Sequence, residues 1–280
     1  MKKLMDGACG SLLWEMAEKR GIERKPTWVY NMEQPELVSD MHLRYITAGA
    51  DMIQTNTFAV NRTSIKRSGY TVPEVIKAAV ECARNAVNSF ASENPGAKLP
   101  EIYLSSGPLT QLLDPFGPVT EEECEEYYEE IISAAAEAGI KTVALETFMD
   151  LEMMKIAAGA AKKYGMTALC SMTFEARHRT MMGNCISDIC EELEELGVDA
   201  VGMNCSKGPV EAADIIREYA ENTTLPLYFK PNSGMGELYD ALQFAKEAAP
   251  VLPLVTYMGS CCGSDETFTA ELKKLIKKED

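Results

Sequence analysis

Short apolar runs alternate with longer amphipathic segments along most of the chain. The short runs are rich in β-branched and aromatic residues, which favour strands, and the longer segments repeat apolar residues at helical spacing. The predicted strands are Lys3–Met5, Asp51–Thr55, Ile102–Ser105, Thr142–Leu145, Thr167–Thr173, Ala200–Met203, Leu227–Phe229 and Leu254–Tyr257. The predicted helices are Pro35–Ala48, Val72–Ser92, Glu121–Ala138, Leu151–Tyr164, Ser187–Leu196, Val210–Glu221, Glu237–Ala248 and Asp265–Lys277.

Alternation of strands and helices indicates a parallel sheet with helical crossovers. Eight such units within 280 residues match the size of a (β/α)8 TIM barrel, so we expect a single barrel domain over residues 1–280. Thr120 is a predicted N-cap, and Gly139 and Gly165 follow predicted helix ends. The alternative, an open doubly wound sheet, requires a glycine fingerprint that Asp6-Gly-Ala-Cys-Gly-Ser11 fits poorly.

The composition narrows the possible partners and the compartment. The formal net charge of −16 argues against binding to nucleic acid or to an anionic membrane. No apolar stretch is long enough to span a bilayer, and the acidic Asp6 argues against a signal peptide, so we expect a cytoplasmic protein. Nine cysteines in that compartment favour metal or catalytic roles over disulfides.

Polar residues follow the predicted strands, where a barrel enzyme carries its active site. Cys205 ends the sixth strand, and Cys261 and Cys262 follow the eighth, in a turn flanked by glycines. Three cysteine sulfurs leave a tetrahedral zinc with one open position, which is typical of a catalytic zinc. Three alternatives remain open: buried inert thiols, a disulfide between the adjacent cysteines, or a closed site with Cys9 as the fourth ligand.

Other strand-end residues suggest how a substrate binds. Asp6 and Glu146 follow strands one and four and are suited to binding an ammonium group, and N–H groups near Gly7 and Ala8 are suited to a carboxylate. Lys230 ends strand seven, either as an ion-paired or solvated lysine or as a Schiff-base lysine of an aldolase. His42 and Trp28 are expected to be structural residues, although Trp28 has the alternative of stacking on a cationic donor.

The chain resembles the homocysteine S-methyltransferase family in an ordered set of short stretches, and Met172–Gly183 looks most like its cobalamin-dependent methionine synthase branch. These stretches are Asp6-Gly-Ala-Cys-Gly-Ser11, Ala48-Gly-Ala-Asp-Met-Ile-Gln-Thr-Asn-Thr-Phe58, Ser106-Gly-Pro-Leu109, Glu146-Thr-Phe-Met-Asp-Leu-Glu152, Gly197-Val-Asp-Ala-Val-Gly-Met-Asn-Cys-Ser206, Lys230-Pro-Asn-Ser-Gly234 and Gly259-Ser-Cys-Cys-Gly263.

The resemblance implies a TIM barrel that transfers a methyl group to the thiolate of homocysteine and forms methionine. It implies Zn²⁺ bound by three cysteines and homocysteine bound by residues at the ends of the first, second, fourth and sixth strands. The implied zinc ligands are Cys205, Cys261 and Cys262, and the implied substrate residues are Asp6, Gly7, Thr55, Glu146 and Asn204.

The methyl donor is the least determined part of this interpretation. The chain lacks the Asp-x-His-x-x-Gly pattern of cobalamin-binding modules, and we expect no cobalamin or folate site within it. We therefore expect a separate methyl-corrinoid protein as donor, with betaine, S-methylmethionine or another sulfonium as the alternative. A non-catalytic subunit that binds homocysteine or zinc is the competing class. Two departures from the family pattern are Ser260 within Gly259-Ser-Cys-Cys-Gly263 and a short stretch between Gly234 and Gly259.

Overall fold

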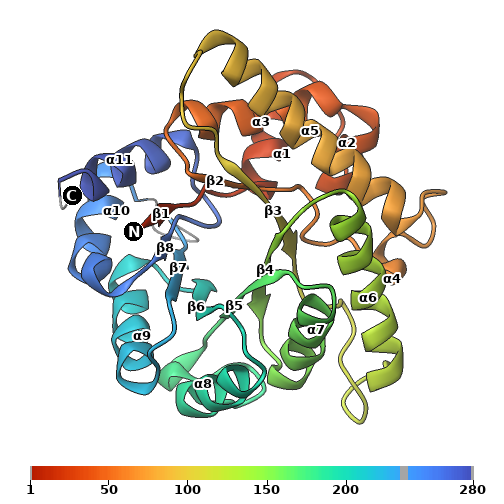
Figure 1. Cartoon of the computed structure of the whole chain (residues 1–280), viewed down its shortest axis with the longest axis vertical. Helices are drawn as coiled ribbons and strands as arrows, with labels where there is room; N and C mark the ends of the chain where they lie inside the picture. The colour runs from red at the N-terminus through yellow and green to blue at the C-terminus, as the bar shows by residue number, and fades with distance from the viewer. Residues whose placement is uncertain (1, 234–238, 279–280) are drawn as a thin grey trace.

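Eight parallel strands form one sheet, in which the order of neighbours is β1-β8-β7-β6-β5-β4-β3-β2. The two ends of this order also meet, since Met5 pairs with Met52 in a parallel bridge and the Asp6 N–H donates to the Met52 carbonyl at 3.1 Å. The sheet is therefore a nearly closed barrel with helices around its outside (Figure 1). The computed structural model describes residues 2–233 and 239–278, and the predicted (β/α)8 TIM barrel is confirmed.

The first seven predicted strands are confirmed to within one residue at their starts. The eighth is shorter than predicted, because Leu254 belongs to the 3-10 helix η3 (Ala249–Leu254). Pro250 and Pro253 interrupt that segment and have no N–H to donate to a neighbouring strand. The strands are β1 (Lys3–Leu4), β2 (Met52–Gln54), β3 (Glu101–Ser106), β4 (Thr142–Phe148), β5 (Thr167–Met172), β6 (Ala200–Cys205), β7 (Leu227–Pro231) and β8 (Tyr257–Met258).

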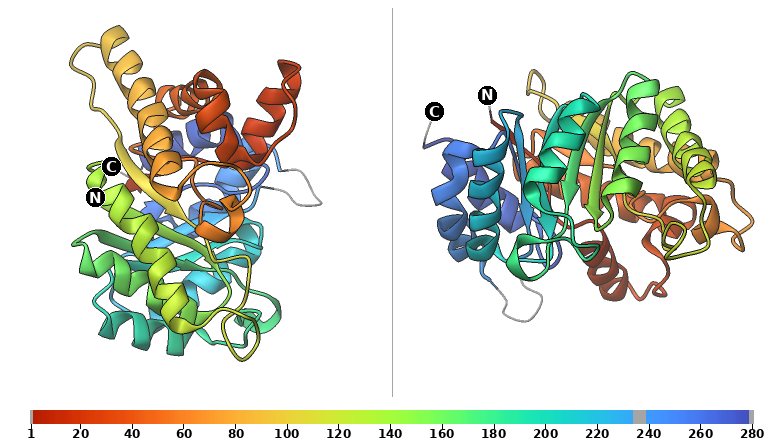
Figure 2. Two further views of the ribbon diagram at one scale, coloured as in Figure 1. Left: turned by 90° about the vertical axis from the view of Figure 1, so that its right-hand side faces the viewer. Right: turned by 90° about the horizontal axis from the view of Figure 1, so that it is seen from below.

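The eight predicted helices cover the outside of the barrel (Figure 2). They are α3 (Pro35–Thr47), α5 (Val72–Glu93), α6 (Glu121–Glu137), α7 (Leu151–Lys163), α8 (Ile186–Glu195), α9 (Pro209–Asn222), α10 (Ala241–Ala248) and α11 (Glu266–Ile276). The predicted start of the seventh helix, at Glu237, lies outside the described residues, as does Gly234. No helix among the described residues has the length and apolarity needed to cross a membrane.

Local signals set several helix boundaries as predicted. The Thr120 hydroxyl accepts a hydrogen bond from the Glu123 N–H at 3.2 Å, and the Thr120 N–H donates to the Glu123 carboxylate at 3.1 Å, which completes a capping box. Gly139 and Gly165 follow α6 and α7 with φ of +84° and +65°, a conformation that glycine adopts without strain.

The sequence prediction missed several short elements in the segments that follow β1, β2 and β5. They are α1 (Gly10–Lys19), η1 (Thr27–Val29), α2 (Tyr30–Glu33), α4 (Arg62–Ile65) and η2 (Ala176–His178).

The interior of the barrel contains one apolar layer with about one side chain per strand. Large side chains from some strands and small ones from others together fill this layer. Its buried members are Met5, Met52, Tyr103, Ala144, Leu169, Ala200 and Tyr228, with the partly buried Tyr257 packed against them.

Candidate active site

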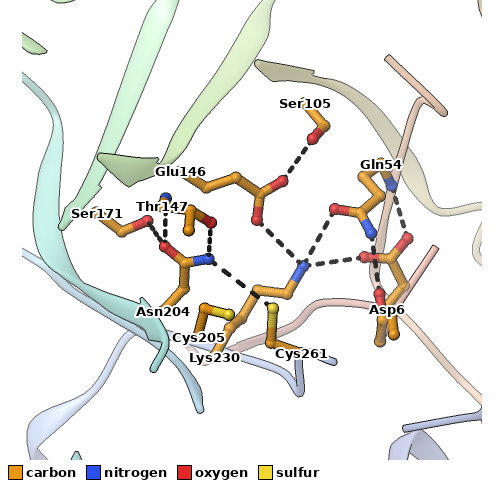
Figure 3. Close-up of polar contacts among 12 residues, drawn as sticks. Asp6, Gln54, Ser105, Glu146, Thr147, Ser171, Asn204, Cys205, Lys230 and Cys261 are labelled. Atoms are coloured by element: carbon orange, nitrogen blue, oxygen red, sulfur yellow. Dashed lines mark hydrogen bonds and ion pairs between the residues drawn. The ribbon is translucent and has the colours of Figure 1, made fainter. Parts of the chain in front are cut away.

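A layer of polar side chains lies next to the apolar layer of the barrel interior, on the side of the C-terminal ends of the strands. Side chains two positions apart on a strand point to the same face, so the residues that follow the apolar layer by two also point inward. These residues are Gln54, Ser105, Glu146, Ser171, Gly202 and Lys230. Figure 3 shows the five that carry long or polar side chains converging in the centre of the barrel.

Lys230 lies at the centre of this polar layer. Its side chain is 1 % exposed, and its Nζ donates to the Tyr103 hydroxyl at 3.1 Å and to Gln54 Oε1 at 3.3 Å. The same Nζ lies 3.5 Å from Asp6 Oδ1 and 3.9 Å from Glu146 Oε2. The sequence alternatives for Lys230 are thereby resolved in favour of an ion-paired lysine, which is buried rather than solvated.

Asp6 and Glu146 lie on opposite sides of the Lys230 ammonium group and are both buried (Figure 3). Asp6 accepts hydrogen bonds from the Gln54 N–H at 2.8 Å and from the Tyr103 hydroxyl at 2.9 Å. Glu146 accepts one from Ser105 at 2.5 Å, and the Tyr228 hydroxyl lies 3.4 Å from its other oxygen. The carboxylate oxygens therefore already have donors from the protein.

Charge balance explains the ionisation of this buried group. Burial alone would lower the pKa of Lys230, but the negative charges of Glu146 and Asp6 outweigh it, and the pKa lies above the ordinary lysine value. Two carboxylates face one ammonium, so one negative charge is in excess, and burial raises the pKa of Asp6 despite the nearby Lys230. A lysine with a raised pKa is a poor Schiff-base nucleophile, which argues against the aldolase interpretation.

The three predicted zinc cysteines lie together beside the polar layer. Their sulfurs, on Cys205, Cys261 and Cys262, all lie within 4.8 Å of one another, and Cys205 Sγ is 3.9 Å from Cys262 Sγ. A tetrahedral zinc with Zn–S bonds of about 2.3 Å separates its sulfurs by about 3.8 Å, so the donor set fits this metal. All three are free thiols, so the alternative of a disulfide between the adjacent cysteines is wrong.

The backbone around these cysteines is shaped to bring the sulfurs together. Cys205 and Ser206 have φ of +58° and +52°, a left-handed conformation that is uncommon outside glycine and often found at functional sites. The Cys261 N–H donates to the Pro231 carbonyl at 2.8 Å, which ties the turn after β8 to the end of β7. Gly259 allows close approach, since a Cβ there would lie 2.7 Å from the Asp6 carbonyl oxygen.

The thiols stay protonated without a cation. The neighbouring Cys205 raises the pKa of Cys261 to about 12, and burial and Glu146 act in the same direction. The pKa of Cys262 is also raised to about 12: its hydrogen bond with Cys205 lowers it, but Cys261 and burial outweigh that effect. Three thiolates in this space require a positive charge among them, which a divalent metal ion supplies.

Asn204 connects the sulfur cluster to the barrel wall. Its Oδ1 accepts from the Thr147 N–H at 2.6 Å and from Ser171 at 2.8 Å, and its Nδ2 donates to Thr147 Oγ1 at 2.7 Å. The same Nδ2 lies 3.9 Å from Cys261 Sγ. Thr147 has φ of +66°, and the amide of Asn204 stabilises that strained conformation.

Two residues that follow β1 have contacts that limit the alternatives from the sequence. Cys9 lies outside the sulfur cluster found among the described residues, and its thiol is 3.5 Å from Asn56 Oδ1. The Ala8 N–H donates to Ser264 Oγ at 3.0 Å and is not free to hold a carboxylate.

Other candidate residues have structural contacts. Thr55 Oγ1 accepts from the Ser105 N–H at 3.2 Å, and the Gly7 carbonyl accepts from Gln54 Nε2 at 2.9 Å. His42 is completely buried, and Trp28 packs edge-to-face on Tyr70, so both are structural as expected.

The sequence analysis missed four partners of the acid pair. Each is a strand residue whose side chain points into the barrel. Inward-facing residues recur at every second position of a strand, and this spacing is the signal that identifies them. They are Gln54, Tyr103, Ser105 and Tyr228.

Comparisons with known proteins agree with the fold and the cysteine cluster described above. Methionine synthases from Mycobacterium leprae and Mycobacterium tuberculosis are each 25% identical to the chain, over 98% and 97% of its length. The chain spans only 24% of each of these relatives.

Among solved structures, the apo form of the homocysteine methyltransferase MmuM from Escherichia coli is 25% identical, with a TM-score of 0.77 over 98% of this chain and 95% of that one. The metallated form has 23% identity and a TM-score of 0.81, covering 97% of this chain and 96% of that one, and it supports the fold. The family model described as "Homocysteine S-methyltransferase" matches residues 3–276, and the chain therefore belongs to the homocysteine S-methyltransferase family of enzymes.

Proposed function

We propose that this enzyme uses zinc to transfer a methyl group to the thiolate of homocysteine, which yields methionine, with residues 1–280 acting as one homocysteine-binding domain. The single observation that carries the proposal is the convergence of three cysteine sulfurs within 4.8 Å at the strand ends of a family barrel. No other set of ligating side chains of that size was found among the described residues.

Each part of the site has a proposed role. Cys205, Cys261 and Cys262 hold the metal, and Asn204 orients Cys261 through its hydrogen bonds with Thr147. Zinc, when bound, lowers the pKa of a substrate thiol and keeps its sulfur as the nucleophilic thiolate. No general base is then needed for the methyl transfer, because the thiol proton leaves on binding.

The substrate's amino-acid end faces the polar layer in this proposal. Asp6 and Glu146 carry one negative charge more than Lys230 neutralises, and the ammonium group of homocysteine is oriented towards this charge. Gly7 and Thr55, which follow β1 and β2, help to bind the substrate. Both acids are held by hydrogen bonds from neighbouring strands, so their carboxylates are oriented before substrate binds.

A methyl-corrinoid protein is our first candidate for the methyl donor. It is supported by the match to proteins named methionine synthase, of which the chain covers about a quarter. A small donor such as betaine, S-methylmethionine or another sulfonium is the second candidate. It is favoured by the similarity to the homocysteine methyltransferase MmuM along 95% of that chain.

The test uses the purified chain loaded with zinc and given homocysteine. Methionine is measured with methylcobalamin, betaine or S-methylmethionine as donor, and bound zinc is measured by elemental analysis. We expect about one zinc per chain and methionine from one donor class. The Cys205→Ala variant loses both, whereas Cys185→Ala, which removes a thiol of similar burial outside the cluster, keeps both.

Two outcomes contradict the proposal. Methylation of homocysteine by metal-free protein would refute the role of zinc. Zinc and homocysteine binding without methylation from any donor would instead support the non-catalytic subunit.

A further inference from the structure

The acid pair that is suited to a substrate ammonium already binds an ammonium of the protein. Lys230 Nζ lies 3.5 Å from Asp6 Oδ1 and 3.9 Å from Glu146 Oε2, and all three side chains are buried. A second ammonium between these carboxylates would have to share oxygen atoms with the first. Lys230 is therefore a direct competitor for the group that homocysteine presents.

Lys230 is firmly held in this position. A protonated lysine has three hydrogens to donate, and three acceptors lie within 3.5 Å, on Tyr103, Gln54 and Asp6. The aliphatic stem passes close to the turn after β8, because a Cβ on Gly259 would lie 3.1 Å from Lys230 Cγ. Moving the ammonium aside would break these contacts and leave buried carboxylates without a counter-charge, which is costly.

The oxygens of the acid pair are also occupied by neutral donors. Asp6 accepts from Tyr103 and from the Gln54 N–H, and Glu146 accepts from Ser105. The excess negative charge is partly relieved by the raised pKa of Asp6. The polar layer is thus close to satisfied before any substrate arrives.

We propose that Lys230 is a specificity-determining residue, which supplies the positive charge of the Asp6–Glu146 pair and so lets the site accept thiols without an α-ammonium group about as well as homocysteine. The inference rests on the proposed function, since it concerns the thiol acceptor of that same site. The acceptor class is a small thiol for which the α-amino group is dispensable.

The experiment compares two thiols that differ only in the amino group. Homocysteine and 4-mercaptobutyrate are titrated into Co²⁺-loaded protein, and the change in visible absorption on thiolate binding gives a Kd for each without any methyl donor. An ammonium–carboxylate hydrogen bond contributes about tenfold or more in affinity. We expect the wild-type protein to bind the two thiols with Kd values that differ by less than about tenfold.

A second measurement removes the ammonium group of Lys230. The Lys230→Gln variant keeps a polar side chain but vacates the space between the carboxylates, and it should favour homocysteine over 4-mercaptobutyrate by at least about tenfold more than wild type. The matched control is Lys162→Gln, which removes the ammonium 3.1 Å from Asp199 and should leave the wild-type ratio unchanged.

The ratio of the two Kd values in the wild-type protein tests the role of Lys230 even if the Lys230→Gln variant does not fold. A preference for homocysteine of about tenfold or more in the wild-type protein overturns the role of Lys230 and leaves the proposed function intact. An unchanged ratio in a folded Lys230→Gln variant also overturns it. If neither thiol changes the absorption of the metal-loaded protein, the proposed function fails and this inference fails with it.

Discussion

His42 makes the stability of the barrel sensitive to acid in a way that one substitution removes. The side chain lies on α3 with no exposed surface, and neither ring nitrogen has a hydrogen-bond partner among the described residues. Burial lowers the pKa of His42 from 6.5 to about 3, because the charged imidazolium would lose its hydration. The folded protein therefore keeps this imidazole neutral at pH values where the unfolded chain protonates it.

The sign and size of the effect follow from proton linkage. With a folded pKa below the unfolded one, the free energy of unfolding falls as the pH drops from about 6.5 towards about 3. Protonation of this one imidazole in the unfolded chain favours unfolding by about 2 kcal/mol at pH 5 relative to pH 7. The His42→Leu variant has no such group, so it should lose about 2 kcal/mol less than wild type over that interval.

The assay is urea unfolding of both proteins at pH 7 and pH 5, followed by circular dichroism. The comparison between the two pH values cancels the packing change that the substitution itself causes. The control is His178→Gln, which removes the only other histidine, a half-exposed one 2.6 Å from Glu218, and should retain the acid sensitivity of wild type. Equal losses of stability in wild type and His42→Leu would refute the assignment.

Two further predictions concern the metal site and the strand beside it. Because the pKa values of Cys261 and Cys262 are raised to about 12, zinc must displace their protons when it binds. The apparent zinc affinity, measured by competition with a chelator, should therefore rise about tenfold or more per pH unit between pH 6 and 8. An affinity that does not change with pH would exclude a thiolate site. The Gly202→Ala variant places a Cβ 1.9 Å from the Tyr228 carbonyl oxygen, which is a backbone atom and cannot rotate away. We expect this variant to be destabilised by about 3 kcal/mol or more, measured by thermal unfolding. An unchanged melting temperature would show that β6 and β7 can separate.

Local pattern was sufficient for most of the fold. Each of the first seven strands starts within one residue of its prediction, because buried parallel strands form continuous apolar runs. The eighth was placed too early, since an apolar run that contains prolines has the composition of a strand but lacks N–H donors for the ladder. The short helices α2 and α4 have only four residues each, too few to display a periodic pattern.

The candidate metal site was also predictable, for a topological reason. In a parallel barrel all strands end at the same side, so Cys205 at the end of β6 and the pair after β8 were expected at the same mouth of the barrel. Their convergence to within 4.8 Å depends on the left-handed backbone at Cys205, which no local pattern indicated.

The sequence by itself determined the alternation of strands and helices, the barrel, and the set of chemical groups at its mouth, since these depend on residue order and on the periods of two and 3.6. Only the tertiary structure decided that Lys230 lies between Asp6 and Glu146. Its contact with Gln54 spans 176 positions of the chain, and closure of the barrel creates it. Which of several inward-facing side chains meet in the centre depends on their lengths and on strand register across the whole ring, and no short segment contains that information.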